Sequence, residues 1–481
     1  MAEQRRGVAY EDVGEDYLDR RQLRSGAAGW VLLAGLGVAY VISGDFAGWN
    51  FGLAEGGWGG LLIATALMGV MYTAMVFSLA ELSSTIPTAG GGYGFARRAM
   101  GPWGGFATGT AILIEYAIAP AAIVVFIGGY IEALGLLGIE SGWPVYLVFY
   151  LIFIGVHLIG VGEALKLMFA ITAIAVVALV VFALGMLPEF SASNLTNIEP
   201  DTSKAGASDF LPFGYAGILA AFVYGIWFFL AVEGVPLAAE ETRDPKRDMP
   251  KGIITAMLIL LAFAALMLLL APGGAGSRAI AESDNPLPLA ADTALGEGSF
   301  VGEFVNYVGL AGLIASFFSI IYAYSRQLFA LSRAGYLPRL LSVTTSRRSP
   351  AVALLVPGVI GFLLAAITED GALLINIAVF GATVSYVLML ASHIVLRRRE
   401  PDLARPYRTP GGVVTSGIGL VLAAAAVVAT FFVDEKAAAI TAGIYVVALA
   451  YFGFYSRHRL VARAPEEEFD AIQRAERTLV S

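Results

Sequence analysis

The chain has 481 residues, of which 58% are hydrophobic and only 14% charged, and its mean hydropathy is +0.76. A soluble domain would carry about 25% charged residues, so this composition excludes an ordinary soluble protein. The absence of cysteine excludes disulfides and thiolate metal sites, three widely spaced histidines argue against a metal cluster, and a net charge of −8 does not favour a nucleic-acid partner.

Apolar runs long enough to cross a bilayer recur along the whole chain. A hydrocarbon core of about 30 Å requires roughly 20 apolar residues in a helix. We therefore expect an all-α polytopic membrane protein rather than a β-barrel, which would show short alternating segments. The twelve predicted spans are 29–54, 58–86, 103–134, 143–160, 163–187, 213–238, 252–272, 304–332, 350–367, 371–396, 413–433 and 437–456.

The distribution of basic residues predicts how these spans are oriented. All but four of the 30 Lys and Arg residues lie in the tails or in loops on the side of the membrane that both termini share. Lys204, Arg278 and Lys436 lie on the other side, and Arg326 lies within the eighth span. Because basic loops favour the cytoplasm, we expect cytoplasmic termini in a plasma (inner) membrane, and residues 1–28 contain no apolar signal peptide.

The same pattern divides the chain into four parts. We expect a cytoplasmic N-terminal tail over 1–28, a transporter core over 29–396, two further helices over 397–456 and a cytoplasmic C-terminal tail over 457–481. The C-terminal tail is predicted to form a short, charged, solvated helix.

An aspartate lies in the middle of the first predicted span, within the segment YVISGDFAGWNFG. A charge at the centre of a spanning helix costs about 2.5–3.5 kcal/mol, and no Lys or Arg lies at a comparable depth to neutralise Asp45. Ser43 and Gly44 weaken the helix beside it and favour an unwound segment. Such backbone is tolerated at membrane depth where it lines a cavity, so Asp45 is expected to face a binding site; the alternative is a packing interface around a protonated aspartate.

A second acid, Glu115, lies in the third predicted span. Ala111 and Ala119 recur with it at helical spacing and form a face of small residues, with Tyr116 on the opposite side. Glu115 is therefore expected to point into the bundle. There it would bind a cation, carry a proton or make a structural hydrogen bond to a neighbouring helix.

The sixth predicted span combines a third acid with aromatic residues around a predicted break. Tyr224, Trp227 and Phe229 form an aromatic cluster, which is usually core packing but beside buried acids can hold an ammonium group. Glu233 lies nearer the cytoplasmic side, so gating or proton coupling is expected for it rather than direct substrate contact. No combination of residues along the chain predicts a catalytic site, and we expect no enzyme activity.

Four motifs together resemble the amino acid–polyamine–organocation (APC) superfamily of secondary transporters. They are Glu81-Leu82 with PTAGGGY at the end of the second span, ETRDPKRDMP after the sixth, Ser325-Arg326 near the end of the eighth with AGYLP after it, and RPYRTP before the eleventh. Within that superfamily the chain resembles the ethanolamine permeases, most densely in RRQLRSGAAGWVLLAGLGVAYVISGDFAGWNFGLAEGG and TGTAILIEYAIAPAA.

The resemblance implies a LeuT-like fold of two inverted five-helix repeats, about 29–187 and 213–396, with broken first and sixth spans and alternating access between them. In amino acid transporters of this fold, the break in the first span holds the substrate carboxylate. Ethanolamine has an ammonium and a hydroxyl but no carboxylate, so Asp45 would supply the missing anion and would repel a full amino acid. The implied function is import of ethanolamine or a closely related small primary amine.

The remaining roles follow from the same resemblance. Ser43, Tyr224 or backbone carbonyls would hold the hydroxyl, and Glu115 would bind the ammonium from the other side or carry a coupled proton. H⁺ or Na⁺ is the possible coupling ion; Ser316 and Ser319 are candidates for a sodium site, although serines in membrane helices more often bond to their own backbone. No cofactor is expected, and the oligomeric state is open. The alternatives are a broader amino acid or polyamine permease and a transporter-like amine sensor.

Overall fold

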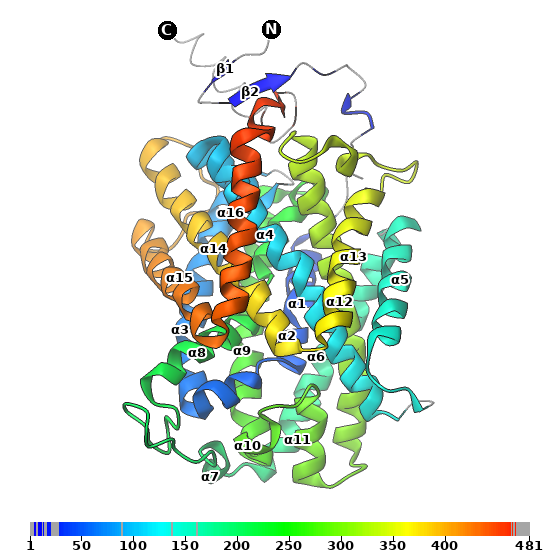
Figure 1. The fold of residues 1–481 in the computed structure, drawn as a ribbon, viewed down its shortest axis with the longest axis vertical. Coiled ribbons are helices and arrows are strands. Elements are labelled where there is room, and N and C mark those ends of the chain that lie inside the picture. The colour runs from blue at the N-terminus through cyan, green and yellow to red at the C-terminus, as the bar shows by residue number, and fades with distance from the viewer. Residues whose placement is uncertain are drawn as a thin grey trace.

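The computed structural model describes residues 4–5, 8–11, 13, 17–20, 28–87, 90–135, 138–159, 162–462, 464 and 467. Long helices run side by side, and two strands from near the two chain ends, β2 (Val8–Glu11) and β3 (Leu460–Val461), meet at one end of the bundle (Figure 1). Three short helices, α7 (Ala192–Leu195), α10 (Ser277–Ile280) and α11 (Pro286–Leu295), lie at the other. We call these two ends the tail end and the distal end.

The remaining helices form the bundle itself. They are α1 (Trp30–Val41), α2 (Ser43–Phe46), α3 (Phe51–Thr85), α4 (Gly91–Ala133), α5 (Trp143–Ile159), α6 (Gly162–Met186), α8 (Gly214–Trp227), α9 (Pro245–Ala275), α12 (Phe300–Arg333), α13 (Ala351–Thr368), α14 (Gly371–Arg399), α15 (Val413–Val433) and α16 (Glu435–Phe454). Among the described residues, short 3-10 segments accompany these helices: η3 (Leu187–Glu189), η4 (Val232–Glu241), η5 (Arg339–Ser342) and η6 (Ser456–His458).

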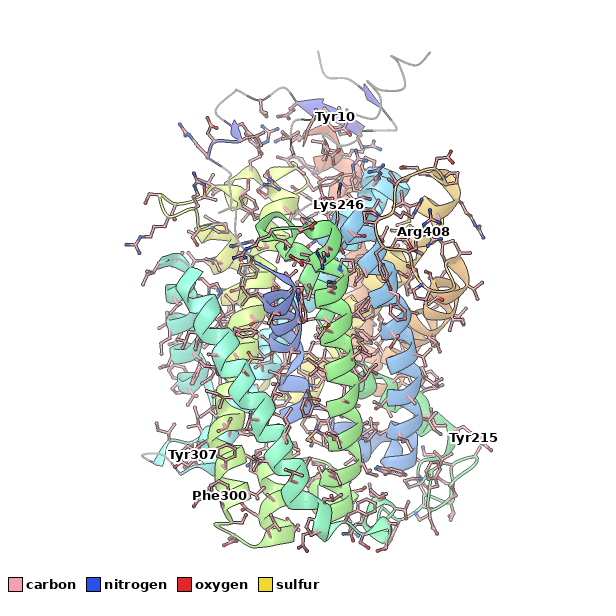
Figure 2. The ribbon with its side chains drawn as sticks, turned by 180° about the vertical axis from the view of Figure 1, so that it is seen from behind. Tyr10, Tyr215, Lys246, Phe300, Tyr307 and Arg408 are labelled. Carbon is pink, nitrogen blue, oxygen red and sulfur yellow. The ribbon has the colours of Figure 1, made fainter. Side chains whose placement is uncertain are left out.

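Ten helical segments in the described part of the chain are long and apolar enough to span a membrane, and α1 and α5 are apolar but shorter. Each predicted span overlaps at least one of these helices, which confirms a multi-pass, all-α membrane protein. Figure 2 shows Tyr10, Lys246 and Arg408 toward the tail end, and Tyr215, Phe300 and Tyr307 toward the distal end. The two labelled basic residues, Lys246 and Arg408, therefore lie toward the end where the two tails meet.

Two helices, α3 and α4, begin before the predicted spans, and each is bent at a glycine close to the predicted boundary. Gly57 in α3 has a φ of 65°, and Gly101 in α4 has a φ of 82°, values that only glycine adopts without strain. The predicted second and third spans begin just after these bends. Each bend thus separates a spanning segment from a shorter piece that precedes it.

The first and sixth predicted spans are both interrupted in mid-course. After α2, Ala47 is extended and Gly48 has a φ of 93°, and regular helix resumes only at α3. After α8, residues 228–231 form a turn that ends at Ala231, a non-glycine residue with a φ of 77°, and the chain continues as the 3-10 segment η4. These interruptions leave peptide groups without helical partners near the middle of the bundle.

A small sheet of tail residues adds strands that the sequence does not predict. Strand β1 (Gln4–Arg5) pairs antiparallel with β2, and β2 pairs parallel with β3. The helix predicted over the C-terminal tail falls mostly on residues outside the described part of the chain. Of the tail residues that are described, Leu460 and Val461 form a strand and Glu467 is buried.

Candidate functional site

The two interrupted helices meet each other at their breaks. The Trp227 indole N–H donates to the Ala47 carbonyl at 2.9 Å, and a Cβ atom on Gly44 would lie 2.5 Å from the Trp227 carbonyl oxygen. Any residue larger than glycine at position 44 would force the two backbones apart. Three predicted site residues, Ser43, Gly44 and Trp227, therefore lie at one junction.

Asp45 projects from the short helix α2 at this junction. Its side chain is 1% exposed, and neither carboxylate oxygen has a hydrogen-bonding partner among the described residues. Its backbone is held in place, because the Asp45 carbonyl accepts from the Trp49 indole N–H at 3.2 Å and Tyr130 donates to the next carbonyl, of Phe46, at 2.9 Å. A buried carboxylate without partners is costly, so this arrangement suits a cation that arrives from outside the chain.

The serine pair beside Asp45 links the first span to α12. The hydroxyls of Ser43 and Ser316 lie 2.8 Å apart, and Ser316 donates to the Tyr40 carbonyl at 2.8 Å. Ser319 instead donates to the Ala315 carbonyl of its own helix at 2.8 Å. Ser316 thus lies next to the break, whereas Ser319 makes the self-bond that serines in membrane helices commonly make.

Glu115 and Glu233 form a second acidic group, separate from Asp45. Their carboxyl groups lie within hydrogen-bonding reach of each other, and both side chains are buried. Tyr116 donates to Glu233 at 3.1 Å, and the Tyr386 hydroxyl lies 3.4 Å from Glu233 and 3.5 Å from Glu115. The inward orientation expected for Glu115 agrees with this placement, and Glu233 joins it from η4.

The position expected for Tyr116 is wrong. Its side chain does not lie opposite Glu115 on the outside of α4 but is 1% exposed and bonded to Glu233. Two further tyrosines that the sequence analysis missed complete the group, since the hydroxyls of Tyr72 and Tyr386 lie 2.7 Å apart. Several tyrosines deep in otherwise apolar spans were the available signal, because a buried phenol requires a hydrogen-bonding partner.

The remaining aromatic candidates lie to either side of the breaks. Tyr224 packs against Phe51 with ring centroids 6.2 Å apart, on the distal side of the junction. Phe229 packs against Tyr72 at 5.4 Å and lines an apolar cavity of about 460 Å³ between α3, α9 and α15. Phe229 therefore borders the Glu115–Glu233 group, and no described contact links it to Asp45.

A family model for amino acid permeases matches residues 31–469. The chain belongs to the amino acid permease family. This is a family of transporters within the APC superfamily and not of enzymes, and it implies a LeuT-like fold.

Characterised and uncharacterised relatives align over most of this permease. An uncharacterized transporter of Rhizobium meliloti is 29% identical over 440 residues, covering 90% of this chain and 92% of its own. A branched-chain amino acid permease of Bacillus subtilis is 26% identical over 75% of this chain and 78% of its own. An aromatic amino acid transport protein of Escherichia coli is 26% identical over 73% and 77%.

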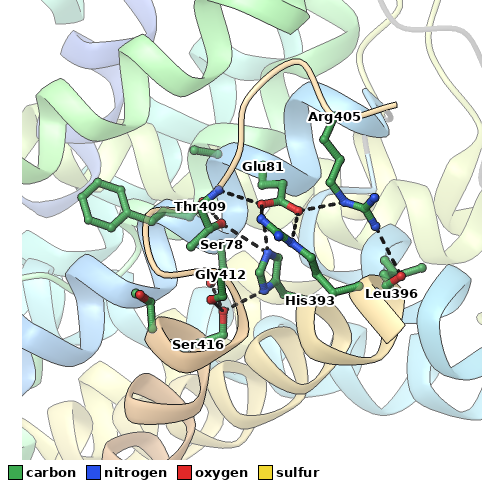
Figure 3. Close-up of polar contacts among 12 residues, drawn as sticks. Ser78, Glu81, His393, Leu396, Arg405, Thr409, Gly412 and Ser416 are labelled. Atoms are coloured by element: carbon green, nitrogen blue, oxygen red, sulfur yellow. Dashed lines mark hydrogen bonds and ion pairs between the residues drawn. The ribbon is translucent and has the colours of Figure 1, made fainter. Parts of the chain in front are cut away.

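Two motifs of this permease meet at the tail end of α3 (Figure 3). Glu81 binds Arg397 through two hydrogen bonds of 2.7 and 2.5 Å and Arg405 at 2.9 Å, and it accepts the Thr409 N–H at 2.7 Å. The His393 ring nitrogen Nε2 lies 3.2 Å from the same carboxylate. The glutamate near the end of the second span and the RPYRTP loop are thus parts of one ion cluster, which no pattern in the sequence predicted.

Carboxyl groups also gather at the distal end of the permease. Asp284, Asp370 and Glu132 lie close enough to influence one another, and burial together with these two neighbours raises the pKa of Asp284 to about 6. Glu369 approaches the same group near Tyr146. Clustered carboxylates at the mouth of a protein raise the local concentration of cations.

Proposed function

We propose that this permease imports ethanolamine or a closely related small primary amine, and that Asp45 holds its ammonium group. The observation that carries the proposal is the buried Asp45 carboxylate, which has no partner among the described residues and projects beside a broken helix. An ammonium group close to such a carboxylate favours its ionised form. The ammonium group of a small amine would then form the ion pair for which Asp45 has no partner among the described residues.

The same carboxylate accounts for selectivity. A full amino acid would place its own carboxylate close to Asp45, where two negative charges repel strongly in a low-dielectric site. Ser43 and Tyr224 are proposed to hold the hydroxyl, and the ring of Trp227 to lie against the ammonium. The carboxylates at the distal end support a cationic substrate, because they would attract it if that end faces the cell exterior.

The Glu115–Glu233 group is proposed as the proton site of the cycle. Two carboxyl groups in mutual reach within an apolar bundle hold one proton between them more readily than two negative charges. The group spans α4 and η4, so gain or loss of that proton changes a contact between the sixth span and the third. A sodium site at Ser316 and Ser319 remains the alternative source of coupling.

The proposed cycle uses twelve spans, of which the first ten form two inverted repeats, with the termini in the cytoplasm. Alternating access then takes place around the junction of the two breaks. The sequence supports this orientation, because most of its Lys and Arg residues fall in the tails or in loops on the same side as the tails.

Uptake of labelled ethanolamine into proteoliposomes under imposed potential, pH and sodium gradients tests the proposal. Asp45→Asn should abolish uptake and Glu115→Gln should remove its dependence on the pH gradient, whereas Asp402→Asn, which changes an exposed carboxyl group, should leave both unchanged. Uptake by Asp45→Asn at the rate of the unchanged protein would contradict the assignment of Asp45. Transport that ignores pH but requires sodium would contradict the proton site.

The names of the relatives favour a second function, transport of amino acids. A branched-chain amino acid permease and aromatic amino acid transport proteins are among the proteins that this chain resembles. Competition decides between the two functions, because a permease for amino acids should lose ethanolamine uptake when leucine or phenylalanine is added in excess. The amine permease should be unaffected by either.

A further inference from the structure

A glutamate of the C-terminal tail occupies a binding site at the tail ends of two helices. Glu467 is 1% exposed although it belongs to the charged segment that was expected to be solvated. Its carboxylate accepts from the Arg97 guanidinium through Nε at 2.8 and 3.0 Å and again through Nη2. The hydroxyls of Tyr336 and Tyr10 donate to it at 2.9 and 3.0 Å.

The groups that hold this carboxylate come from three separate parts of the chain. Arg97 lies on α4, Tyr336 follows α12, and Tyr10 lies on β2 in the N-terminal tail. Burial and the nearby Glu467 carboxylate raise the pKa of the Tyr336 hydroxyl, so it stays protonated and remains a donor. A buried, bidentate ion pair with two further donors has the geometry of a specific site rather than of a surface contact.

The strands next to Glu467 fasten both tails to the same place. In the parallel pair β2–β3, Glu11 lies opposite Val461, and the Val461 N–H donates to the Ala334 carbonyl at 3.0 Å. Tyr17 of the N-terminal tail donates to the Arg333 carbonyl at the end of α12 at 3.0 Å. Both tails are therefore attached to α12, and through Arg97 to α4.

The residue just before α1 is bonded to a different group of helices. Ala28, just before α1, pairs with Thr242 at the end of η4, and its carbonyl accepts the Arg243 N–H at 3.0 Å. At this end η4 closes against α4, where Leu237 packs on Gly91. If alternating access moves the two broken spans against the rest of the bundle, opening of the tail end separates α1 and η4 from α4 and α12.

We propose that Glu467 is an autoinhibitory latch: by seating both tails on α4 and α12, it opposes the separation of α1 and η4 from those helices. Release of Glu467 from Arg97, Tyr336 and Tyr10 loosens the N-terminal tail, which the contacts of Tyr17 with Arg333 and of Glu11 with Arg339 then hold with fewer bonds. The latch thereby sets how often the tail end opens. This inference rests on alternating access but not on the identity of the substrate.

Labelling of a cysteine at position 237 measures the opening directly. The chain has no cysteine, so Leu237→Cys provides a single thiol at a site that is 3% exposed when η4 lies against α4. In nanodiscs, Glu467→Gln in this background should increase the rate of maleimide labelling about fivefold or more. Glu400→Gln, which weakens the neighbouring Arg98–Glu400 ion pair, is the matched control and should label at the parent rate. Equal rates for Glu467→Gln and the parent would overturn the latch.

A reversible lock provides the second test. Glu11→Cys with Val461→Cys places two thiols at paired positions of β2 and β3, and neither single variant can cross-link within one chain. Oxidation of the double variant should stop ethanolamine uptake, and reduction should restore it. If the cross-linked protein takes up ethanolamine as fast as the same variant does after chemical reduction, the latch is overturned. If even the unmodified protein takes up no ethanolamine, the proposed function fails, while the labelling result still decides the latch.

Discussion

Asp45 and Glu81 are buried acids at opposite extremes of hydrogen bonding. Both side chains are 1% exposed, yet Glu81 is bonded to two arginines, a histidine and a backbone N–H, whereas Asp45 has no partner among the described residues. The two side chains are therefore equally inaccessible to solvent, and they differ in the number of hydrogen-bonding partners that the chain provides. A saturated carboxylate stabilises the fold, while an unsaturated one keeps its binding capacity for a ligand.

The strongest test of this contrast is Asp45→Asn. The substitution keeps the shape of the side chain but removes the charge that would pair with the ammonium, so ethanolamine uptake should fall by about 100-fold or more. Thermal stability should be unchanged or higher, because an unpaired buried charge is costly to the fold. Uptake and melting temperature, measured on the same purified protein, check both halves of the expectation.

Glu81→Gln should give the opposite result. Loss of the carboxylate leaves Arg397 and Arg405 without their shared anion and should lower the free energy of unfolding by about 3 kcal/mol. The fraction that remains folded should bind ethanolamine with unchanged affinity, because Glu81 lies at the tail end, away from the breaks. A weaker affinity with normal stability would show that this cluster is part of the binding site.

The Glu115–Glu233 group is intermediate between Glu81 and Asp45, because its carboxyl groups have some hydrogen-bonding partners but no basic residue among those described. If the two carboxyl groups share one proton, Glu115→Gln and Glu233→Gln should each remove the stimulation of uptake by an inward proton gradient. The double variant should then be no worse than either single one, because residues that act as a unit are not additive. Additive losses would indicate two independent roles.

The smallest expected effect concerns Asp284 at the distal end. With its pKa raised to about 6, this carboxyl group is charged at neutral pH and loses its charge as the pH falls through that value. The KM for ethanolamine should therefore rise about twofold between pH 7 and pH 5 through loss of electrostatic attraction. At pH 7, Asp284→Asn should already have the KM that the parent reaches at pH 5, and its KM should change little between the two pH values. An unchanged pH dependence in this variant would assign the effect to another group.

Local rules of helix formation predicted much of the fold. The apolar runs located the spans, and the glycines and serine around Asp45 predicted an interruption in the first span, because both signals act within a few neighbouring residues. The start of the predicted second span after Gly57 also matched the bend that the structure places there. Such features depend on short stretches of chain and can be identified without knowing what packs against them.

The polar groups that depend on distant partners were not predictable in the same way. Tyr116 was assigned to the wrong side of its helix because a face of small residues was given more weight than the phenol's need for a partner. The link between Glu81 and Arg405 and the seat of Glu467 on Arg97 join residues hundreds of positions apart. Periodicity along one helix contains no information about such pairs.

The close fit of Gly44 against Trp227 has a mechanical consequence. The two interrupted spans are fastened at the centre, where Gly44 lies against the Trp227 carbonyl and the indole bonds to Ala47, and again at the tail end, where Ala28 pairs with Thr242. Because they are in contact at these two positions, the two spans should tilt together. A cation that settles beside Asp45 would thus displace both helices together, and small shifts at mid-membrane would grow with distance along them.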